Sequence, residues 1–336
     1  MSVKVSIVCV TYNHEEYIAQ AIEGFIQQKT NFKFKVYIYD DASTDKTSDI
    51  IQLYVNKFPD LFVYIRANEN NFQKGVNLDR DFIWPLITSE YVAYCEGDDY
   101  WIDPNKLQKQ TDILDKNKDC TICFHPVKVV WEDGEQKCSI FPTPSFRFYK
   151  KRLSFNDLIQ HNFIQTNSVM YRWCLKDCPN ELPRNIIPTD YFVHLLHAQR
   201  GDIIFLPDIM SCYRKHRGGI WYGVFENENW FLKYTIPHLS FYRALETKFK
   251  CDKKNEQISL IFSAIPFFLK NKKFSIIEQM SNEYGESYIR AIEKLMSKSS
   301  LVEQKFKKKK RKYKRIIIVL ATICILLFVI IIHRGI

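Results

Sequence analysis

The first 130 residues alternate between short apolar runs and amphipathic segments, and this alternation restricts the fold more than any other feature of the sequence. The apolar runs have the length and composition of strands and lie at residues 3–10, 34–39, 61–65 and 91–95. Strands that are separated by helices pair in parallel, because each connection crosses back over the sheet. The sequence therefore predicts an α/β fold in which a mostly parallel sheet carries helices on both faces.

Helix signals lie between these strands. Asn13 and Glu16 have the spacing of a capping box, and they predict a helix that begins there and reaches residue 28. Further helices are predicted to end near residue 58, to span residues 77–87 and to begin at Pro104. Beyond them, residues 131–140 predict a hairpin that turns at Gly134.

Polar side chains follow three of the predicted strands at the point where each strand ends. They are Thr11, Tyr12 and Asn13 after the first strand, Asp40 and Asp41 after the second, and Glu96, Asp98 and Asp99 after the fourth. Ligands of such sheets bind outside the carboxyl ends of the strands, so the fold would gather these side chains along one edge. Helix capping explains Asn13 and Asp45 equally well.

The segment Glu96-Gly97-Asp98-Asp99 is acidic and follows an apolar strand directly. Neighbouring carboxylates repel one another, and a helix cap needs only one of them. A divalent cation is the simplest compensation for Asp98 and Asp99, because hard cations prefer carboxylate oxygens. We therefore expect a metal site after the fourth strand.

The first strand–helix turn excludes the common phosphate-binding motifs. Residues 11–16 read Thr-Tyr-Asn-His-Glu-Glu and contain no glycine, so a diphosphate could not approach the backbone as it does in dinucleotide-binding enzymes. The sequence also contains no GxxxxGK[ST] motif. Phosphate groups would have to be held by a metal ion and side chains, and the acidic segment is suited to that role.

Three segments together resemble the signature of family 2 glycosyltransferases, the large bacterial inverting group of GT-A fold. They are residues 6–13 (SIVCVTYN), 39–45 (YDDASTD) and 96–101 (EGDDYW). The resemblance extends over about residues 2–222. It implies a Rossmann-like GT-A sheet and a nucleotide-sugar donor, usually a UDP-sugar.

The resemblance also assigns roles to residues of this chain. The donor-binding residues that it implies are Thr11, Tyr12, Asn13, Asp40, Asp41, Glu96, Asp98 and His216. Within this set, Tyr12 and the two neighbouring aspartates would contact the base, and Glu96 would contact the ribose. Glu96 departs from the family, which usually has aspartate there. Because that position meets the nucleoside, the metal site would survive the change.

The cation implied by the resemblance is Mg²⁺ or Mn²⁺, held by Asp98, Asp99 and His216. The catalytic base would be Asp190, which opens a predicted helix ahead of a Tyr-Arg-x-His-x-x-Gly-x-Trp segment. Capping of that helix would by itself explain Asp190. His194 and His197 on the same helix are expected to be packing or surface residues.

The net charge of +10 is concentrated near the end of the chain. Residues 305–315 contain nine basic and no acidic residues, and without them and Arg334 residues 1–304 are formally neutral. The mostly apolar run at 316–333 follows, and a basic segment beside such a run is typical of a membrane helix with its basic end in the cytoplasm. We expect a membrane-attached protein with a cytoplasmic catalytic domain and no nucleic-acid partner.

These features predict four parts of the chain, namely a catalytic GT-A domain at 1–224, a helical subdomain at 225–304, a basic collar at 305–315 and a transmembrane helix at 316–333. The expected activity is metal-dependent, inverting transfer of a sugar from a nucleoside diphosphate to a hydroxyl of a glycan or lipid-linked glycan in surface polysaccharide synthesis. One alternative is a nucleotidyltransferase that forms sugar nucleotides. Another is a catalytically silent, membrane-attached protein that binds nucleotide sugars.

Overall fold

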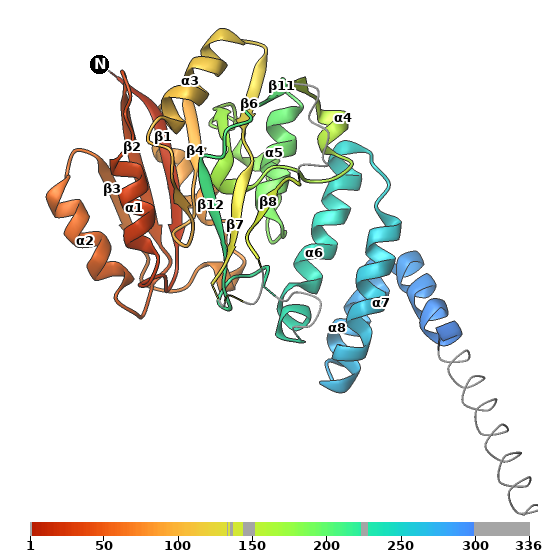
Figure 1. The fold of residues 1–336 in the computed structure, drawn as a ribbon. Coiled ribbons are helices and arrows are strands. Elements are labelled where there is room, and N and C mark those ends of the chain that lie inside the picture. Colours follow the sequence, from red (N-terminus) through yellow and green to blue (C-terminus); the bar gives the residue numbers. More distant parts are fainter. Residues whose placement is uncertain (1, 133, 135–136, 144–151, 223–227, 299–336) are drawn as a thin grey trace, which may run out of the picture. The chain divides into compact units, whose positions relative to one another are not determined.

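The computed structural model describes residues 2–132, 134, 137–143, 152–222 and 228–298, and its main feature is a sheet of eight strands (Figure 1). The strands are β1 Val3–Thr11, β2 Lys33–Asp40, β3 Phe62–Arg66, β4 Tyr91–Tyr94, β6 Cys120–Phe124, β9 Arg152–Leu153, β10 Met170–Arg172 and β11 Asp202–Phe205. They lie in the order β3-β2-β1-β4-β10-β6-β11-β9. The pairs β3–β2, β2–β1, β1–β4 and β6–β11 are parallel, which confirms a mostly parallel α/β sheet.

Helices cover both faces of this sheet. The α-helices labelled in Figure 1 are α1 Ile18–Ile26, α2 Thr47–Lys57, α3 Lys106–Lys116, α4 Phe155–Leu158, α5 Thr189–Ala198, α6 Glu228–Phe249, α7 Lys254–Lys270 and α8 Phe274–Glu283, of which α3 and α5 show the covering of the two faces. In β10, the sulfur of Met170 lies 3.7 Å from the hydroxyl of Thr111 in α3. The next residue, Tyr171, stacks on His197 of α5 with ring centroids 4.1 Å apart. Because successive strand residues face opposite sides, α3 and α5 lie on opposite faces.

Helix α1 illustrates how the sequence builds the core between helix and sheet. Its apolar residues recur at helical spacing and are fully buried; they are Ile18, Ala21, Ile22 and Phe25. They share one buried cluster with alternate residues of β1, namely Val5, Ile7 and Cys9. This cluster fixes the carboxyl end of β1, where the predicted site begins.

The described residues also form a second sheet, which has four strands. Its strands are β5 Tyr100–Trp101, β7 Val127–Trp131, β8 Ser139–Phe141 and β12 Ser211–Lys215, in the order β5-β12-β7-β8. Strands β7 and β8 pair antiparallel, with Val127 opposite Phe141 and Val129 opposite Ser139, so a hairpin forms but its first arm begins before the predicted start at residue 131. Strand β12 ends one residue before His216, so this sheet positions that histidine.

Two of the predicted helices need correction. Asn13 does not begin α1, which starts at Ile18. Residues 77–87 do not form an α-helix either, because they contain a π-helical turn, η2 (Asp79–Ile83), followed by a 3₁₀ turn, η3 (Trp84–Leu86). Pro85 lies at the start of η3, where its missing amide hydrogen is not needed, and this favours the beginning of a new turn there over a continuous helix.

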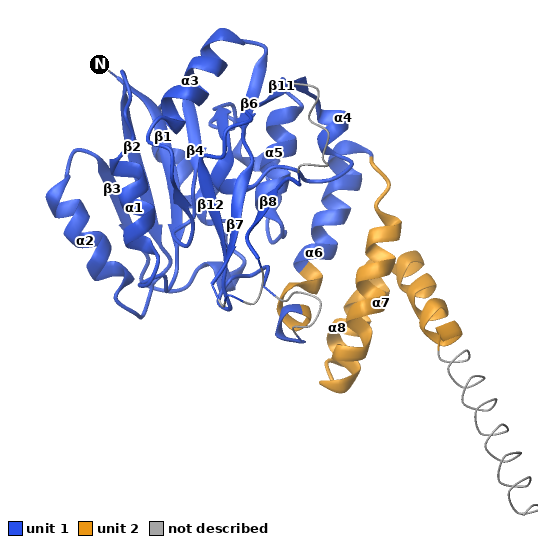
Figure 2. Cartoon of the chain, in the orientation of Figure 1, with its two compact units in different colours: residues 1–230, 237–250 blue, residues 231–236, 251–336 orange. Residues whose placement is uncertain are grey.

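The chain divides into two compact units (Figure 2). Residues 1–230 and 237–250 form the first unit, and residues 231–236 and 251–336 form the second. Within the second unit, α7 and α8 bury an apolar core that includes Ile261, Ala264, Phe268 and Met280. The domain division expected at residue 224 stays a prediction.

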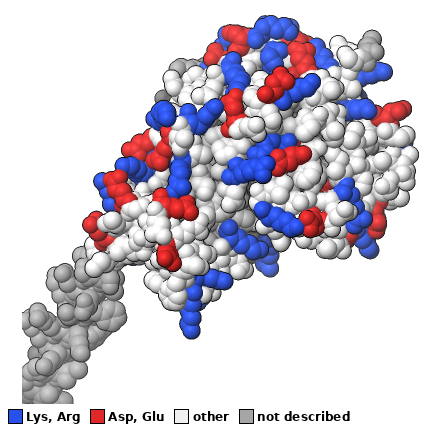
Figure 3. Space-filling view, turned by 180° about the vertical axis from the view of Figure 1, so that it is seen from behind, with Lys and Arg blue, Asp and Glu red and all other residues white. Residues whose placement is uncertain are grey.

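The membrane segment cannot be followed in the structure. Across the described ranges, no helix is long and apolar enough to cross a membrane. The basic collar at 305–315 and the predicted membrane helix at 316–333 lie outside those ranges. On the face of the molecule in Figure 3, basic and acidic side chains are intermingled, in agreement with the formal neutrality of residues 1–304.

Candidate active site

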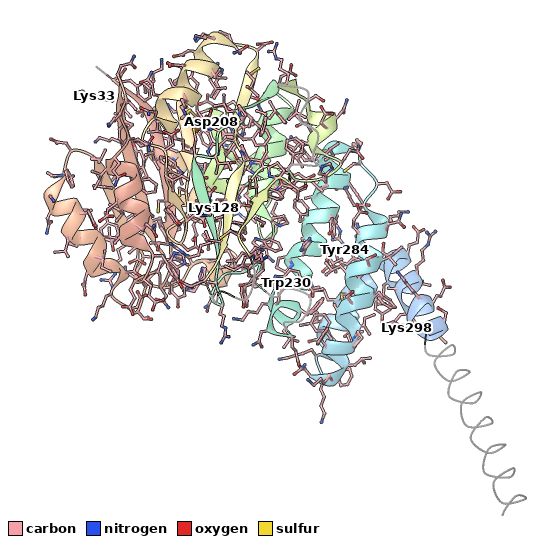
Figure 4. All side chains as sticks on the ribbon, viewed as in Figure 1. Lys33, Lys128, Asp208, Trp230, Tyr284 and Lys298 are labelled. Carbon is pink, nitrogen blue, oxygen red and sulfur yellow. The ribbon has the colours of Figure 1, made fainter. Side chains whose placement is uncertain are left out.

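The polar residues that follow β1, β2 and β4 meet at one edge of the eight-stranded sheet. Thr11 pairs in register with Asp40 at the ends of β1 and β2. After β4, the amide of Gly97 donates a hydrogen bond of 3.0 Å to the carbonyl of Val10. Lys33, at the start of β2, marks the opposite edge of the sheet (Figure 4). The structure therefore brings together the three clusters expected from the sequence.

Gly97 is the residue that allows the acidic segment to approach β1 so closely. A Cβ atom at this position would lie 2.6 Å from Oγ1 of Thr11 and 3.0 Å from Nδ1 of His14. A contact of 2.6 Å is far inside van der Waals distance, so any side chain would push the segment away from β1. The glycine thus sets the position of both carboxylates that follow it.

Asp98 lies between two histidines. Its Oδ2 atom is 3.0 Å from Nε2 of His216 and 3.8 Å from Nε2 of His14, a residue of the turn after β1. Burial alone would raise the pKa of Asp98, but the hydrogen bond with His216 and the proximity of His14 outweigh it, so the pKa is lowered. Asp98 therefore carries a negative charge at neutral pH, as a cation ligand must.

Asp99 is fully buried and has a different environment. Its Oδ1 accepts a hydrogen bond of 2.8 Å from the amide of Arg214, and its Oδ2 accepts one of 2.8 Å from Nδ2 of Asn167. Burial, followed by the charge of Asp98, raises the pKa of Asp99 well above its usual value. Both oxygens are engaged with the protein, so Asp98 is the more available ligand; the predicted metal contact of Asp99 stays a prediction.

Arg214 supports this loop, although the sequence did not single it out. Its guanidinium donates hydrogen bonds to the backbone oxygen of Asp98 and, over 2.6 Å, to Oε1 of Gln20. It also lies over the rings of Tyr17 and Tyr100, 4.6 and 5.0 Å from their centroids. Arg214 is the arginine of the Tyr-Arg-x-His segment, and that adjacency to His216 was the available signal.

The predicted base-binding residues Asp40 and Asp41 are buried, and their carboxylates hold neighbouring loops. Asp40 accepts hydrogen bonds from the amide of Ser43 at 2.9 Å and the hydroxyl of Tyr64 at 3.1 Å. Asp41 accepts bonds of 2.8 and 2.9 Å from the amides of residues 71 and 72. Their contacts with a base stay predictions. Tyr12 is half-buried and Glu96 is exposed at the same edge.

Asn13 links two loops across the edge and does not cap α1. Its Oδ1 accepts a hydrogen bond of 2.8 Å from the amide of Thr44, and its own amide donates one of 2.9 Å to Oγ of Ser43. Its φ of 54° is in the left-handed region, which asparagine tolerates better than most residues. The side chain is therefore committed to the loop after β2, which is why the expected capping box does not form.

Asp190 lies in the first turn of α5 but does not cap this helix. Pro188 occupies the capping position, and no side chain caps the helix start. Oδ2 of Asp190 instead accepts a hydrogen bond of 2.9 Å from Oγ1 of Thr166, in the 3₁₀ turn η4 (Thr166–Ser168). Among the described residues, Oδ1 of Asp190 has no hydrogen-bond donor. Helix capping therefore does not explain why an aspartate lies at position 190.

A second carboxyl group, which the sequence did not indicate, lies within electrostatic range of Asp190. Asp79 in η2 has a buried Oδ1 atom that finds no hydrogen-bond partner in the described part of the chain. Burial, followed by the charge of Asp190, raises the pKa of Asp79 to about 7. The adjacent Arg80 pairs with Asp81 at 2.7 Å. Nothing in the local sequence distinguishes Asp79 from an ordinary surface acid.

The two histidines of α5, His194 and His197, are core residues, as expected. His194 accepts or donates a hydrogen bond with the hydroxyl of Tyr171, and His197 stacks on the same ring. Both are fully buried, and burial lowers the pKa of His194 to about 4 and that of His197 to about 3. They are neutral packing residues at physiological pH.

Comparison with known sequences places this site in a family. The family described as "Glycosyl transferase family 2" matches residues 6–177, just over half of the chain. An uncharacterized protein of Mycobacterium tuberculosis is 44% identical over 226 residues, which make up 67% of this chain and 63% of the relative. The chain thus spans slightly less than two thirds of the length of its mycobacterial relatives. The putative teichuronic acid biosynthesis glycosyltransferase TuaG of Bacillus subtilis is 26% identical over 166 residues, 49% of this chain and 61% of TuaG.

The fold agrees with this assignment. The crystal structure of Staphylococcus aureus TarS residues 1–349, in complex with UDP-GlcNAc, superposes with a TM-score of 0.54 and 19% identity, covering 86% of this chain and 79% of that one. At this identity the likeness shows the fold alone, and it confirms the GT-A architecture. On the family match, the chain belongs to glycosyl transferase family 2.

Proposed function

We propose that this protein is a metal-dependent, inverting glycosyltransferase that moves a sugar from a nucleoside-diphosphate donor to an acceptor hydroxyl. The observation that carries the proposal is the pairing of Asp98 with His216 at 3.0 Å, at the sheet edge where this family binds its donor. The donor is a UDP-sugar, as the UDP-GlcNAc complex of TarS suggests. The acceptor is a glycan or lipid-linked glycan in surface polysaccharide synthesis; the name of TuaG, which refers to teichuronic acid biosynthesis, supports a role in making a polysaccharide.

The residues at this edge fit a divalent cation. Asp98 supplies a charged carboxylate oxygen and His216 an imidazole nitrogen, a donor set that suits Mn²⁺ and is compatible with Mg²⁺. Two buried polar atoms beside them, Oγ1 of Thr11 and Nδ1 of His14, lack partners among the described residues. When bound, the ion supplies positive charge that stabilises the diphosphate as it leaves. Asp99 orients the loop through Arg214 and Asn167 and does not itself need to reach the ion.

Asp190 has the geometry of a general base. Thr166 holds its Oδ2 at 2.9 Å, and Oδ1 accepts no hydrogen bond from the described residues. Oδ1 is then free to accept the proton of an acceptor hydroxyl as that oxygen attacks the anomeric carbon. Attack opposite the leaving diphosphate is a single displacement, so the configuration of the sugar inverts.

Replacement of Asp190 by Asn tests this assignment. Asparagine keeps the shape and the bond from Thr166 but cannot accept the proton, so turnover should fall about a hundredfold or more while donor affinity is unchanged. Turnover is measured as release of nucleoside diphosphate from a panel of nucleotide sugars, and donor affinity by calorimetry with Mn²⁺.

The matched control is Asp208→Asn, the same change at an exposed carboxylate near Lys109. It should leave turnover within about twofold of wild type, because surface changes away from a site have small effects. If Asp190→Asn retains more than about a tenth of wild-type turnover, the base is another residue. If no donor of the panel is hydrolysed or transferred by the wild-type protein, the proposed activity itself is wrong.

We further propose that residues 316–333 anchor the protein in a membrane with the catalytic unit on the cytoplasmic side. This proposal rests on the sequence, in which an uncharged apolar run follows nine basic residues. A lipid-linked acceptor would lie in the same membrane, so the anchor would raise its local concentration around the active site.

A further inference from the structure

His14 is held beside the proposed cation site by its backbone. Its amide donates a hydrogen bond of 2.8 Å to Oγ1 of Thr47, and its carbonyl accepts bonds of 2.9 Å from the amides of Tyr17 and Ile18. Three backbone hydrogen bonds therefore fix the turn after β1, and the side chain projects from a defined position. This side chain is 17% exposed.

The imidazole of His14 has no hydrogen-bond partner that explains its position. Its Nε2 is 3.8 Å from Oδ2 of Asp98, which is too long for a hydrogen bond. Its Nδ1 is buried and has no partner among the described residues. Oγ1 of Thr11, which like Nδ1 of His14 lies close to Gly97, is also buried and has no partner among the described residues. Nε2 is the ring nitrogen that faces Asp98, and it has no hydrogen-bond partner among the described residues, so it is the atom of His14 that is available to a cation.

The distances between the ligand atoms of His14, Asp98 and His216 are those expected around a single cation. Ligand atoms that share an ion at about 2.1 Å lie between about 3 and 4.2 Å apart. The separation of Asp98 Oδ2 from His216 Nε2 is 3.0 Å and from His14 Nε2 is 3.8 Å, and both values fall in this range. The ligand atoms of all three residues lie within 4.8 Å of one another. The two imidazole rings are nearly perpendicular, at 85°, so neither blocks the other.

We propose that His14 is a third protein ligand of the cation, together with Asp98 and His216. The inference rests on the proposed function only in taking this edge as a cation site. Two imidazoles and one carboxylate form a nitrogen-rich donor set, and imidazole favours Mn²⁺, Co²⁺ and Zn²⁺ over Mg²⁺, which prefers oxygen ligands. His14 thus makes the protein select a transition-metal ion.

Metal binding to the full-length protein without donor tests the proposal directly. Mn²⁺ affinity is measured by electron paramagnetic resonance titration and Mg²⁺ affinity by its competition with Mn²⁺. His14→Ala should weaken Mn²⁺ binding about tenfold or more and change Mg²⁺ binding much less, so the preference for Mn²⁺ collapses. Asp98→Asn should weaken both ions, and His161→Ala, at an exposed histidine, should weaken neither.

Pulsed electron paramagnetic resonance on protein with ¹⁵N-labelled histidine counts the nitrogen ligands of Mn²⁺. We expect two in the wild type and one in His14→Gln, which preserves much of the side-chain volume if the alanine variant is unstable. A single nitrogen ligand in the wild type, or an unchanged Mn²⁺ to Mg²⁺ preference in folded His14 variants, would overturn the proposal. Because no donor or acceptor is present, these outcomes do not depend on whether sugar transfer is the correct activity.

Discussion

Replacement of Asp79 by Asn should stabilise the protein, and the gain should grow with pH. In the folded protein the pKa of Asp79 is raised from 3.8 to about 7, first by burial and then by the charge of Asp190. Below pH 4 the carboxyl group is protonated in both the folded and the unfolded chain, so it causes no loss of stability. Between pH 4 and pH 7 the unfolded chain releases the proton while the folded chain retains it, and folding becomes progressively less favourable.

The magnitude follows from the shift in pKa. A difference of about three units corresponds to about 4 kcal/mol of unfolding free energy once both states are ionised. Asparagine has no proton to lose, so the difference between Asp79→Asn and wild type should increase by about 2–3 kcal/mol from pH 5 to pH 8. Urea unfolding of both proteins at several pH values measures this difference directly.

Two further variants provide a control and test the contribution of Asp190 to the raised pKa of Asp79. Asp208→Asn, at an exposed carboxylate, should show no such trend with pH. Asp190→Asn removes the neighbouring charge, so the pKa of Asp79 should fall and the effect of Asp79→Asn should become smaller. A stability difference between Asp79→Asn and wild type that is constant from pH 5 to pH 8 would refute the raised pKa of Asp79.

Three other predictions test the role of Asp98, the close packing at Gly97 and the proposed membrane anchor. Asp98→Ala should abolish metal-dependent UDP binding without unfolding the protein; unchanged affinity in calorimetry with Mn²⁺ would contradict its role. Gly97→Ala should lower the unfolding free energy by about 1–3 kcal/mol in urea, because its Cβ would lie 2.6 Å from Thr11 Oγ1, whereas Gly285→Ala, with nothing within 4 Å, should not. Removal of residues 305–336 should release a protein that still consumes donor but transfers poorly to a membrane-embedded acceptor; sedimentation of the shortened protein with membranes after a high-salt wash would exclude the anchor.

The parts of the fold that depend on local pattern could be predicted from the sequence. Alternating strand and helix signals gave the parallel pairs, and the carboxyl ends of β1, β2 and β4 gave the location of the site. The helix expected at 77–87 is wrong because the segment forms two short turns, and Pro85 at the start of the second favours the break between them. The helix start at Asn13 failed because this side chain bonds to Thr44, a contact between two loops that no local pattern reveals.

The parts of the site that depend on distant contacts could not be predicted. Asp79 and Asp190 interact although more than a hundred residues separate them, and neither flanking sequence indicates the other. His14 could be read only as one residue of the first turn until the structure placed it near Asp98. The family resemblance named Asp98, Asp190 and His216, but it assigned no role to the residues that hold them, such as Thr166 and Arg214.

Strand β10 has a consequence for the order in which a growing chain acquires its site. It fills the centre of the sheet between β4 and β6, and the turn just before it supplies Thr166 to Asp190 and Asn167 to Asp99. A nascent chain that ends before residue 166 can pair β1 to β4, but its acidic loop lacks these partners and β4 keeps an open edge. Chains are made from the amino terminus at about 5–20 residues per second, so this edge persists for seconds on the ribosome and is a target for chaperones. Synthesis of residues 166–172 covers the edge of β4, whereas the acidic loop gains its contacts with Arg214 and His216 only later. Nascent-chain proteolysis should therefore show protection of β4 before protection of the acidic loop.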